Sequence, residues 1–247
     1  MKAGQKLKVQ MGFETDEERK KRVAQEKKEN KHQKEYIRQL SQPIEKQVNK
    51  IDTGIFKSFL WKEGCVYFEK INRKFIVDNN NKDFLHLLSL YFSENQDFET
   101  IAGGEIRKGL LIYGSCGTGK SSIFDIIQNI SKRYGLKSIW FKNVSVHQVI
   151  TDYNTQGEEI VKIYTRGKIH FDDLGAEKEA NSWGIREKLM IRILETRYNL
   201  FKEKGIKTYI TTNLSLEELR KFYGMRVYDR LFEMFNFLEL NGNSRRY

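Results

Sequence analysis

Residues 114–121 have the spacing of a phosphate-binding loop. They read Gly-Ser-Cys-Gly-Thr-Gly-Lys-Ser, which satisfies the pattern G-x-x-x-x-G-K-[ST]. Glycines let the backbone wrap round phosphates with its amides turned inward, and the start of the following helix adds positive partial charge. In such a loop Lys120 reaches the β- and γ-phosphates, and the hydroxyl of Ser121 ligates magnesium. The sequence therefore predicts a nucleotide site made of Gly114, Ser115, Cys116, Gly117, Thr118, Gly119, Lys120, Ser121 and Ser122.

An acidic pair follows an apolar run further along the chain. Asp172 ends the stretch KIHFD, and Asp173 comes directly after it. At the tip of a strand parallel to the one before the loop, the first acid steadies magnesium. The second extends past it and is placed to orient or deprotonate an attacking water. Asp172 is thus the predicted metal acid and Asp173 the predicted catalytic acid, whereas His170 is predicted to be a structural residue of the strand.

A polar residue also ends the β-branched run KTYITT. Parallel strands end at one edge of their sheet, where the ligands of open α/β sheets collect. Asn213 is therefore predicted to stand near the γ-phosphate and to offer its amide to the attacking water. The alternative is a helix cap for the segment LEELRKFY, but Ser215, followed by Glu218, suits a capping box better.

These residues need a scaffold in which strands alternate with helices. Five short runs are predicted as strands: 109–114, 138–141, 168–172, 207–212 and 235–240. Amphipathic stretches such as SSIFDIIQNISKRY and REKLMIRILETRYNLFKEKG separate them. Strand alternating with helix implies a parallel sheet whose two faces are both covered. The predicted fold class is α/β, a P-loop NTPase with a five-stranded parallel sheet covered by helices on both faces.

The composition is strongly basic. Of the 247 residues, 44 are Lys or Arg and 33 are Asp or Glu, so the formal net charge is +11. Such an excess favours a polyanionic partner such as nucleic acid. Two cysteines, Cys65 and Cys116, with four scattered histidines, exclude a disulfide framework and a four-ligand zinc site, which indicates a reducing, cytoplasmic setting. No apolar run has the length of a signal peptide or a membrane span, so no membrane partner is expected.

Three regions are expected along the chain. Residues 1–50 hold many charges and few apolar positions, and are predicted to be a charged helical or disordered arm, either a solvated tail or a basic segment that binds a partner protein. Residues 51–82 form an aromatic and basic connecting segment. Residues 83–247 form the nucleotide-binding domain.

The connecting segment admits two interpretations. Its rings and cations either contact a nucleic acid, by stacking on bases and pairing with phosphates, or the rings belong to the core. The residues concerned are Trp61, Tyr67, Phe68 and Phe75, with Lys62, Lys70, Arg73 and Lys74.

Several stretches in the C-terminal part of the chain resemble one family. KGLLIYGSCGTGKSS, IHFDDLGAE, ILETRY, YITTNLSLEEL, YGMRVYDRLFEM and LNGNSRR are similar, in order and spacing, to the AAA+ ATPases of the DnaC/DnaI helicase-loader type and to the transposition helper IstB. The resemblance covers residues 83–247. It implies an AAA+ domain that binds ATP and Mg²⁺ and hydrolyses ATP to ADP and phosphate. It also implies that Asp172 binds magnesium, that Asp173 is catalytic and that Asn213 is the first sensor.

The resemblance assigns a role to Arg230 as well. An arginine at this place in the family reaches the γ-phosphate of a neighbouring subunit, which implies a homo-oligomer that forms through Arg230. Arg226 is the second choice for this arginine finger. The alternative for Arg230 is an intramolecular ion pair with Asp229 or Glu233 on a solvated helix face.

Two features depart from the family pattern. Cys116 stands in the phosphate loop at a position that supplies backbone, so binding should survive it. Only residues 241–247 follow the last predicted strand, which leaves no room for the C-terminal helical lid of larger AAA+ proteins. Arg245 and Arg246 are weak candidates for a second sensor.

The function predicted is that of a DNA-replication helper. A helicase-loader-like ATPase would assemble on DNA, expected to be single-stranded, and with a replicative helicase through its N-terminal segment. An IstB-like transposition helper, whose partner would be a transposase, is the alternative from the same family. A small-molecule P-loop kinase needs an acceptor site and an arginine-rich lid, and no such lid is visible. A non-hydrolysing adaptor that binds ATP only to order its fold is the remaining alternative.

Overall fold

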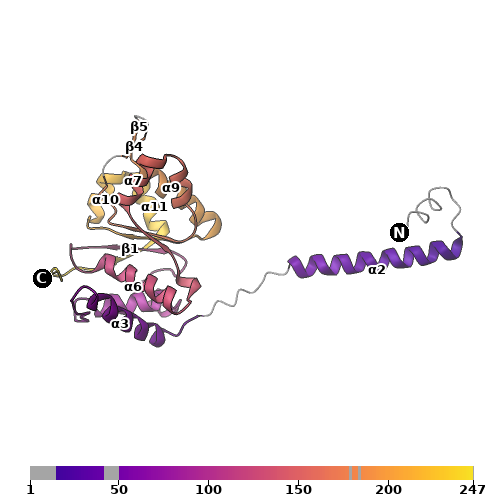
Figure 1. Ribbon diagram of the computed structural model, residues 1–247, viewed down its shortest axis with the longest axis horizontal. Helices are drawn as coiled ribbons and strands as arrows, with labels where there is room; N and C mark the ends of the chain where they lie inside the picture. Colours follow the sequence, from indigo (N-terminus) through magenta and orange to yellow (C-terminus); the bar gives the residue numbers. More distant parts are fainter. Residues whose placement is uncertain (1–14, 42–49, 178–179, 183–184, 247) are drawn as a thin grey trace. The chain divides into compact units, whose positions relative to one another are not determined.

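The computed structural model of the chain describes residues 15–41, 50–177, 180–182 and 185–246, and it divides into two compact units, Met1–Val48 and Asn49–Tyr247. In the first unit the described part is one helix, α2 (Asp16–Ser41; Figure 1). Its first turn holds three acidic residues, whose charge suits the positive end of the helix dipole. Part of the predicted arm, residues 1–50, thus lies outside the described residues. Among the described residues, no helix is long and apolar enough to cross a membrane.

The second unit is built on a five-stranded parallel sheet, as predicted. The strands are β1 (Gly109–Tyr113), β2 (Lys142–Ser145), β3 (Ile169–Asp172), β6 (Thr208–Thr211) and β7 (Phe235–Glu239). Their order across the sheet is β2-β3-β6-β1-β7. Because all pairs are parallel, the carboxyl ends of β1, β3 and β6 meet at one edge. A separate antiparallel hairpin, β4 (Ala180–Ser182) with β5 (Ile185–Glu187), was not predicted.

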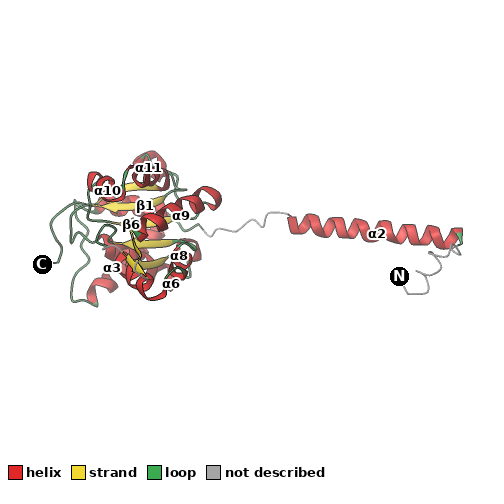
Figure 2. Cartoon of the chain, turned by 90° about the horizontal axis from the view of Figure 1, so that it is seen from above, coloured by secondary structure: helices red, strands yellow, loops and turns green. Residues whose placement is uncertain are grey.

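Helices cover both faces of this sheet (Figures 1 and 2). One layer contains α3 (Thr53–Glu69), α4 (Lys82–Phe92), α5 (Asp97–Ala102) and α6 (Lys120–Arg133), and the other contains α7 (Val146–Gln156), α8 (Glu159–Tyr164), α9 (Leu189–Lys204), α10 (Leu216–Tyr223) and α11 (Met225–Met234). Leu110 and Ile112 enter the first core and Leu111 enters the second. Since both faces are buried, β1 is an unbroken apolar run, and the predicted P-loop α/β class is confirmed.

The strand expected at 138–141 is misplaced. Lys137–Ile139 form a 3-10 turn, and pairing with β3 begins at Lys142, whose amide donates to the carbonyl of Lys168 (3.0 Å). The run is apolar because Ile139 and Phe141 are buried in the core. The true strand β2 lies at the edge of the sheet and has one buried residue, so its sequence KNVS lacks the apolar signal of an inner strand.

A buried arginine joins the beginnings of two central strands. Arg197 of α9 is fully buried, and its Nε donates to the hydroxyl of Thr208 (2.6 Å). Its Nη2 donates to the carbonyls of Gly167 (2.9 Å) and Lys207 (3.1 Å), the residues before β3 and β6. The arginine of the ILETRY stretch therefore holds the beginnings of the strands whose far ends carry the acids and Asn213, and the carbonyls satisfy its buried donors.

The segment that precedes α4 packs into the second unit. Phe56 and Leu60 of α3 are buried, and Phe59 stacks on Tyr134 with ring centroids 3.7 Å apart. Buried Glu63 accepts a hydrogen bond from Arg133 at the end of α6 (2.8 Å). α3 is thus fastened to the helix that begins at the phosphate loop.

Candidate functional site

The phosphate loop joins β1 directly to α6. Gly117 and Gly119 have φ angles of 80° and 103°, which residues with a Cβ atom rarely adopt. A Cβ at Gly119 would meet no atom within 4 Å, so this side of the loop is open. Helix α6 then begins at Lys120, and its free amides point toward the loop. The loop has the open concave backbone that anionic phosphates need.

Lys120 lies at the centre of the site. Its ammonium donates to the carbonyls of Gly114 (2.8 Å) and Ser115 (2.7 Å) and to Oδ1 of Asn213 (2.8 Å). The residue is only 6% exposed, and this burial lowers the pKa of the ammonium below its usual value, against the opposing pull of the carboxylates that follow β3. A cation held this way is available to an anionic ligand, because phosphate oxygens are stronger acceptors than carbonyls.

The acidic pair is held by the neighbouring strand. The hydroxyl of Thr211 donates to Oδ1 of Asp172 and accepts the amide of Asp173 (3.1 Å). Asp173 has a φ of 62°, so the chain turns sharply after the strand. Oδ1 of Asp173 then accepts the amide group of Asn213 (2.6 Å). The two adjacent acids thus have different surroundings.

The four residues predicted from the sequence are therefore connected. Lys120 bonds to Asn213, Asn213 bonds to Asp173, and Asp172 stands beside Asp173 with the hydroxyl of Thr211 between them. Ser215 caps α10 and forms the full capping box with Glu218, which leaves the side chain of Asn213 to the site.

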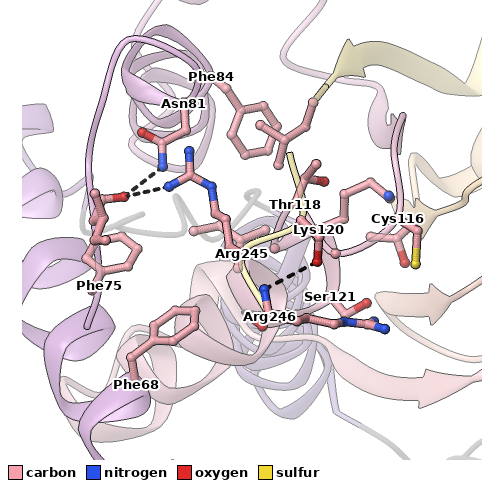
Figure 3. Close-up of a pocket in the computed structure, with 18 of the residues that line it drawn as sticks. Phe68, Phe75, Asn81, Phe84, Cys116, Thr118, Lys120, Ser121, Arg245 and Arg246 are labelled. Carbon is pink, nitrogen blue, oxygen red and sulfur yellow. Dashed lines mark hydrogen bonds between the residues drawn. The ribbon is translucent and has the colours of Figure 1, made fainter. Parts of the chain in front are cut away.

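A cavity of about 710 Å³ adjoins these residues (Figure 3). Its polar wall is formed by residues 116–122 of the loop with Asp172, Asp173 and Asn213. Its volume lies in the range of small-molecule and cofactor sites, about 300–1,000 Å³. The hydroxyl of Ser121 and the carboxylate of Asp172 are hard oxygen donors, and Mg²⁺ is usually held by one or two such protein groups together with substrate phosphates. The residues present fit a magnesium nucleotide.

The opposite wall of the cavity was not predicted. It is formed by the segment between α3 and α4 and by the C-terminal residues, where the guanidinium of Arg245 bonds to both carboxylate oxygens of Asp78 (2.9 and 2.8 Å). The amide of Arg245 donates to the carbonyl of Gly117 (2.9 Å), and Arg73 donates to the carbonyl of Arg246 (3.0 Å). Figure 3 shows Arg245 reaching across from the phosphate loop toward the segment that carries Phe75.

The arginine pair of α11 lies elsewhere. Nη1 of Arg230 donates to Glu195 of α9 (2.8 Å), and its guanidinium lies 4.8 Å from the centre of the Tyr198 ring. Arg226 shares the same carboxylate at 3.2 Å and is 75% exposed, against 22% for Arg230. The alternative prediction, an ion pair within the chain, is right in kind but wrong in its partner. Arg230 pairs with Glu195 of α9 and not with Asp229 or Glu233 of its own helix. Neither arginine lines the cavity.

His170 has a structural place, as its sequence context suggested. It is fully buried in β3, its ring stacks on Phe124 at 3.9 Å, and its Nδ1 hydrogen-bonds to Oδ1 of Asn143 (2.6 Å). Burial lowers the pKa of the imidazole to about 3, so the ring stays neutral at pH 7.

No protein-family model matches the chain, and no curated protein does. Among solved structures, the chain is similar to the DnaC helicase loader (TM-score 0.48, 22% identity, 66% of this chain and 92% of that one). It is also similar to DnaI (TM-score 0.46, 20% identity, 69% and 87%) and to AMPPCP-bound DnaA from Aquifex aeolicus (TM-score 0.45, 16% identity, 70% and 50%).

Proposed function

We propose that the chain is a Mg²⁺-dependent ATPase that assists DNA replication in the manner of a helicase loader. The observation that supports it best is the hydrogen-bonded series Lys120–Asn213–Asp173, which faces a nucleotide-sized cavity beside the phosphate loop. Phosphoryl transfer needs a cation, a polar amide and a carboxylate next to a bound nucleotide, and these three residues supply them at the wall of the cavity.

The loop and its lysine would bind the phosphates of ATP. The amides at the start of α6 and the ammonium of Lys120 supply positive charge in a partly buried setting, where electrostatic contacts are stronger than in water. The phosphate oxygens would replace the carbonyls that Lys120 contacts. Ser122 follows Ser121 in the first turn of α6 and completes the predicted set of binding residues.

Hydrolysis would be carried by the residues at the strand tips. Magnesium held by Ser121 and Asp172 would neutralise charge on the phosphate oxygens. Asp173 would accept a proton from the attacking water or orient it, because its carboxylate projects beyond the strand. Asn213 would hold that carboxylate in place through the 2.6 Å contact and sense the phosphate through Lys120.

Arg230 is proposed to complete the site of a neighbouring copy. A guanidinium that arrives from outside the pocket neutralises charge on the transferring phosphoryl group, which is worth about 10³–10⁵ in rate. In the single chain Arg230 is held by Glu195, so docking of a second copy would have to replace that carboxylate. The proposed state of the active enzyme is therefore a homo-oligomer.

The proposed partners are DNA and a replicative helicase. The net charge of +11 suits a polyanion, and the sequence of helix α2 is rich in charged residues and poor in apolar ones, which suits contact with another protein. Truncation of residues 1–50 should leave ATP binding intact and weaken recruitment of the helicase. Loss of ATP binding on truncation would contradict the separation of these roles.

ATP turnover with and without single-stranded DNA tests the proposal. Release of phosphate that rises with DNA supports it. Binding of ATP without turnover under any of these conditions would favour an adaptor, and transfer of phosphate to a metabolite would favour a small-molecule kinase. Either result would overturn the proposed function.

A mixing experiment tests the role of Arg230. Arg230→Ala should bind ATP normally and hydrolyse it about 10³-fold or more slowly. Mixing it with Lys120→Ala should restore part of the turnover, because an intact arginine from one copy then meets an intact pocket on another. Arg226→Ala tests the second choice for the finger, and it should hydrolyse ATP at nearly the wild-type rate if Arg230 is the finger. Wild-type turnover that is independent of protein concentration, with no rescue on mixing, would remove the role in trans.

A further inference from the structure

Exposed apolar side chains gather on α3 and the segment that follows it. Of the eleven large hydrophobic residues that are exposed in the described part of the chain, five lie between residues 55 and 77: Ile55, Trp61, Ile71, Ile76 and Val77. Trp61 is 53% exposed, although it has the largest side chain of these five residues. The remaining six are spread over the rest of the chain, from Val23 to Phe232.

The segment after α3 folds back onto the helix and makes one surface with it. The ring of Phe75 lies 5.7 Å from that of Trp61 and 5.8 Å from that of Phe68. A Cβ at Gly64 would lie 2.6 Å from the Phe75 ring, so only glycine lets the ring cross the helix at this point. The amide of Arg73 donates to the carbonyl of Phe68 (2.9 Å). This hydrogen bond stabilises the turn in which the chain reverses direction after α3. Trp61 therefore stands beside the segment 70–77.

Exposed basic residues lie on the same two segments as the ring of Trp61. The five basic residues of this surface are all exposed: Lys57, Lys62, Lys70, Arg73 and Lys74. Lys57 lies one helical turn before Trp61 on the same face of α3, so it can flank a ligand on the ring. Lys62 follows Trp61 in the sequence and points about 100° further round the helix, so it adds charge at the border of the ring. In the part of the chain that the structure describes, none of the four lysines forms an ion pair.

Most acidic side chains near these cations already form ion pairs with arginines from other segments. Glu63 is buried and pairs with Arg133 (2.8 Å), and Asp78 pairs with Arg245 (2.8 Å). Glu69 is the one exposed acid in the range 57–77. The surface formed by Ile55, Lys57, Trp61, Lys62 and residues 70–77, here called the α3 surface, is thus basic with an aromatic ring among its charges.

We infer that the α3 surface binds single-stranded DNA, with Trp61 stacked on an unpaired base and the lysines on the flanking phosphates. Stacking on exposed rings combined with a row of cations is the chemistry by which proteins hold single strands without reading their sequence. The inference rests on the proposed function, and it names the place of the DNA contact.

Charge complementarity selects this occupant over two others. Residues 1–50 of the same chain hold 14 basic and 8 acidic side chains, so they would be repelled by the α3 surface. A second copy that docked through its own α3 surface would bring the same basic side chains. A polyanion gains from every lysine instead, because it releases its condensed counterions on contact.

The same segment also borders the nucleotide cavity. Arg73, Lys74, Phe75 and Ile76 line it from the side opposite Lys120. DNA that orders the outer side of this segment therefore acts on the wall of the ATP site, which gives DNA a physical route to stimulate turnover.

Tryptophan fluorescence reports the stacking directly. The chain has three tryptophans, and the double variant Trp140→Phe with Trp183→Phe leaves Trp61 as the only tryptophan, whose emission can be excited selectively over that of tyrosine. Titration of this full-length variant with a dT oligonucleotide of about 20 bases should quench the emission. A wild-type-like affinity for the oligonucleotide without any change in emission would overturn the stacking.

Binding affinity tests the ring and its position. Trp61→Ala should weaken binding of a labelled dT oligonucleotide about tenfold, and Trp61→Phe should restore most of it, because a ring remains. Trp140→Ala is the matched control, since that tryptophan is 46% exposed but lies outside the α3 surface, and it should bind as the wild type does. ATP binding should be unchanged in all three variants, which shows that they are folded.

Salt dependence tests the cations. Replacing Lys57 and Lys62 by glutamine should lower the slope of log affinity against log salt by about 1.4, since each lost phosphate contact on a single strand removes about 0.7. Lys204→Gln with Lys221→Gln removes the same charge from elsewhere and should leave the slope nearly unchanged.

Two failures have different meanings. If the wild type binds no oligonucleotide, both the DNA-binding part of the proposed function and the assignment of the α3 surface are wrong. If the wild type binds DNA and the Trp61 and lysine variants bind it equally well, only the α3 surface is wrong.

Discussion

The two ends of the nucleotide cavity are built in different ways. At the phosphate end, the polar groups follow β1, β3 and β6 directly, and their backbones are fixed by ladder pairing such as Ile112 with Thr211. At the other end, the wall depends on side-chain contacts between two segments that are 167 positions apart, above all the pair of Arg245 and Asp78. The first end is set by a buried sheet, and the second by a partly exposed ion pair.

This difference predicts that the phosphate end contributes most to catalysis and that the opposite wall changes ATP binding only slightly. Groups that a sheet edge holds in place need no rearrangement when charge develops on a bound phosphate, and such preorganisation is usually the largest contribution to catalysis. An exposed ion pair contributes little and is screened by salt. We therefore expect large losses from changes at the phosphate end and small ones from changes at the opposite wall.

The largest effect is expected from Lys120→Ala. It removes the positive charge at the phosphates and leaves Asn213 and two carbonyls without their donor. ATP affinity should fall about 100-fold, in line with the loss of charge-assisted hydrogen bonds in a partly buried site. Calorimetric titration with ATP measures it. Lys132→Ala, on the exposed side of the same helix, is the control and should bind ATP normally.

Asn213→Ala should lower turnover about 10- to 100-fold and change ATP affinity only slightly. The change removes the amide that holds Asp173 at 2.6 Å, so the carboxylate loses its orientation while the loop keeps the phosphates. Steady-state phosphate release at saturating ATP measures it. Ser215→Ala separates this role from the helix cap, because it should lower stability by about 1 kcal/mol and leave turnover intact. Equal turnover in the two variants would remove Asn213 from the site.

The smallest effect is expected at the opposite wall. Arg245→Gln should weaken ATP binding about threefold or less, and Asp78→Asn should do the same. Combined, the two changes should cost no more than either alone, since they remove one interaction. Arg245 lowers the pKa of Asp78 below its usual 3.8, so the pair is intact at pH 7 and is lost only as the pH falls through that lowered pKa. A loss as large as that of Lys120→Ala would make the two ends equivalent and break the comparison.

The same contrast explains how much the sequence could predict. The loop, Asp172, Asp173 and Asn213 follow apolar runs directly, so a local pattern and the rule for parallel strands were enough to bring them together. Thr211 was missed because its contact with Asp172 depends on the register of β6 against β3, which no local signal states. Arg245 was considered only as a second sensor, because its pairing with Asp78 spans most of the chain.

The partner of Arg230 was missed for a related reason. Sequence neighbours on one helix suggest Asp229 or Glu233, but the packing of α11 on α9 brings Glu195 closer. Similarly, β2 was placed too early because an edge strand is only partly buried and its residues look polar. In each case tertiary packing decided what local preference left open.

The most direct test of the proposed ATPase site is Asp173→Asn. Asparagine keeps one side-chain oxygen for the amide of Asn213 but cannot take a proton from water, so the site should keep its shape and lose its base. In a single-turnover measurement with bound ATP, we predict an affinity within about threefold of the wild type and a hydrolysis rate that is lower by about 10²–10⁴. Hydrolysis at the wild-type rate, with ATP bound as tightly as before, would contradict the assignment of Asp173 and with it the proposed site.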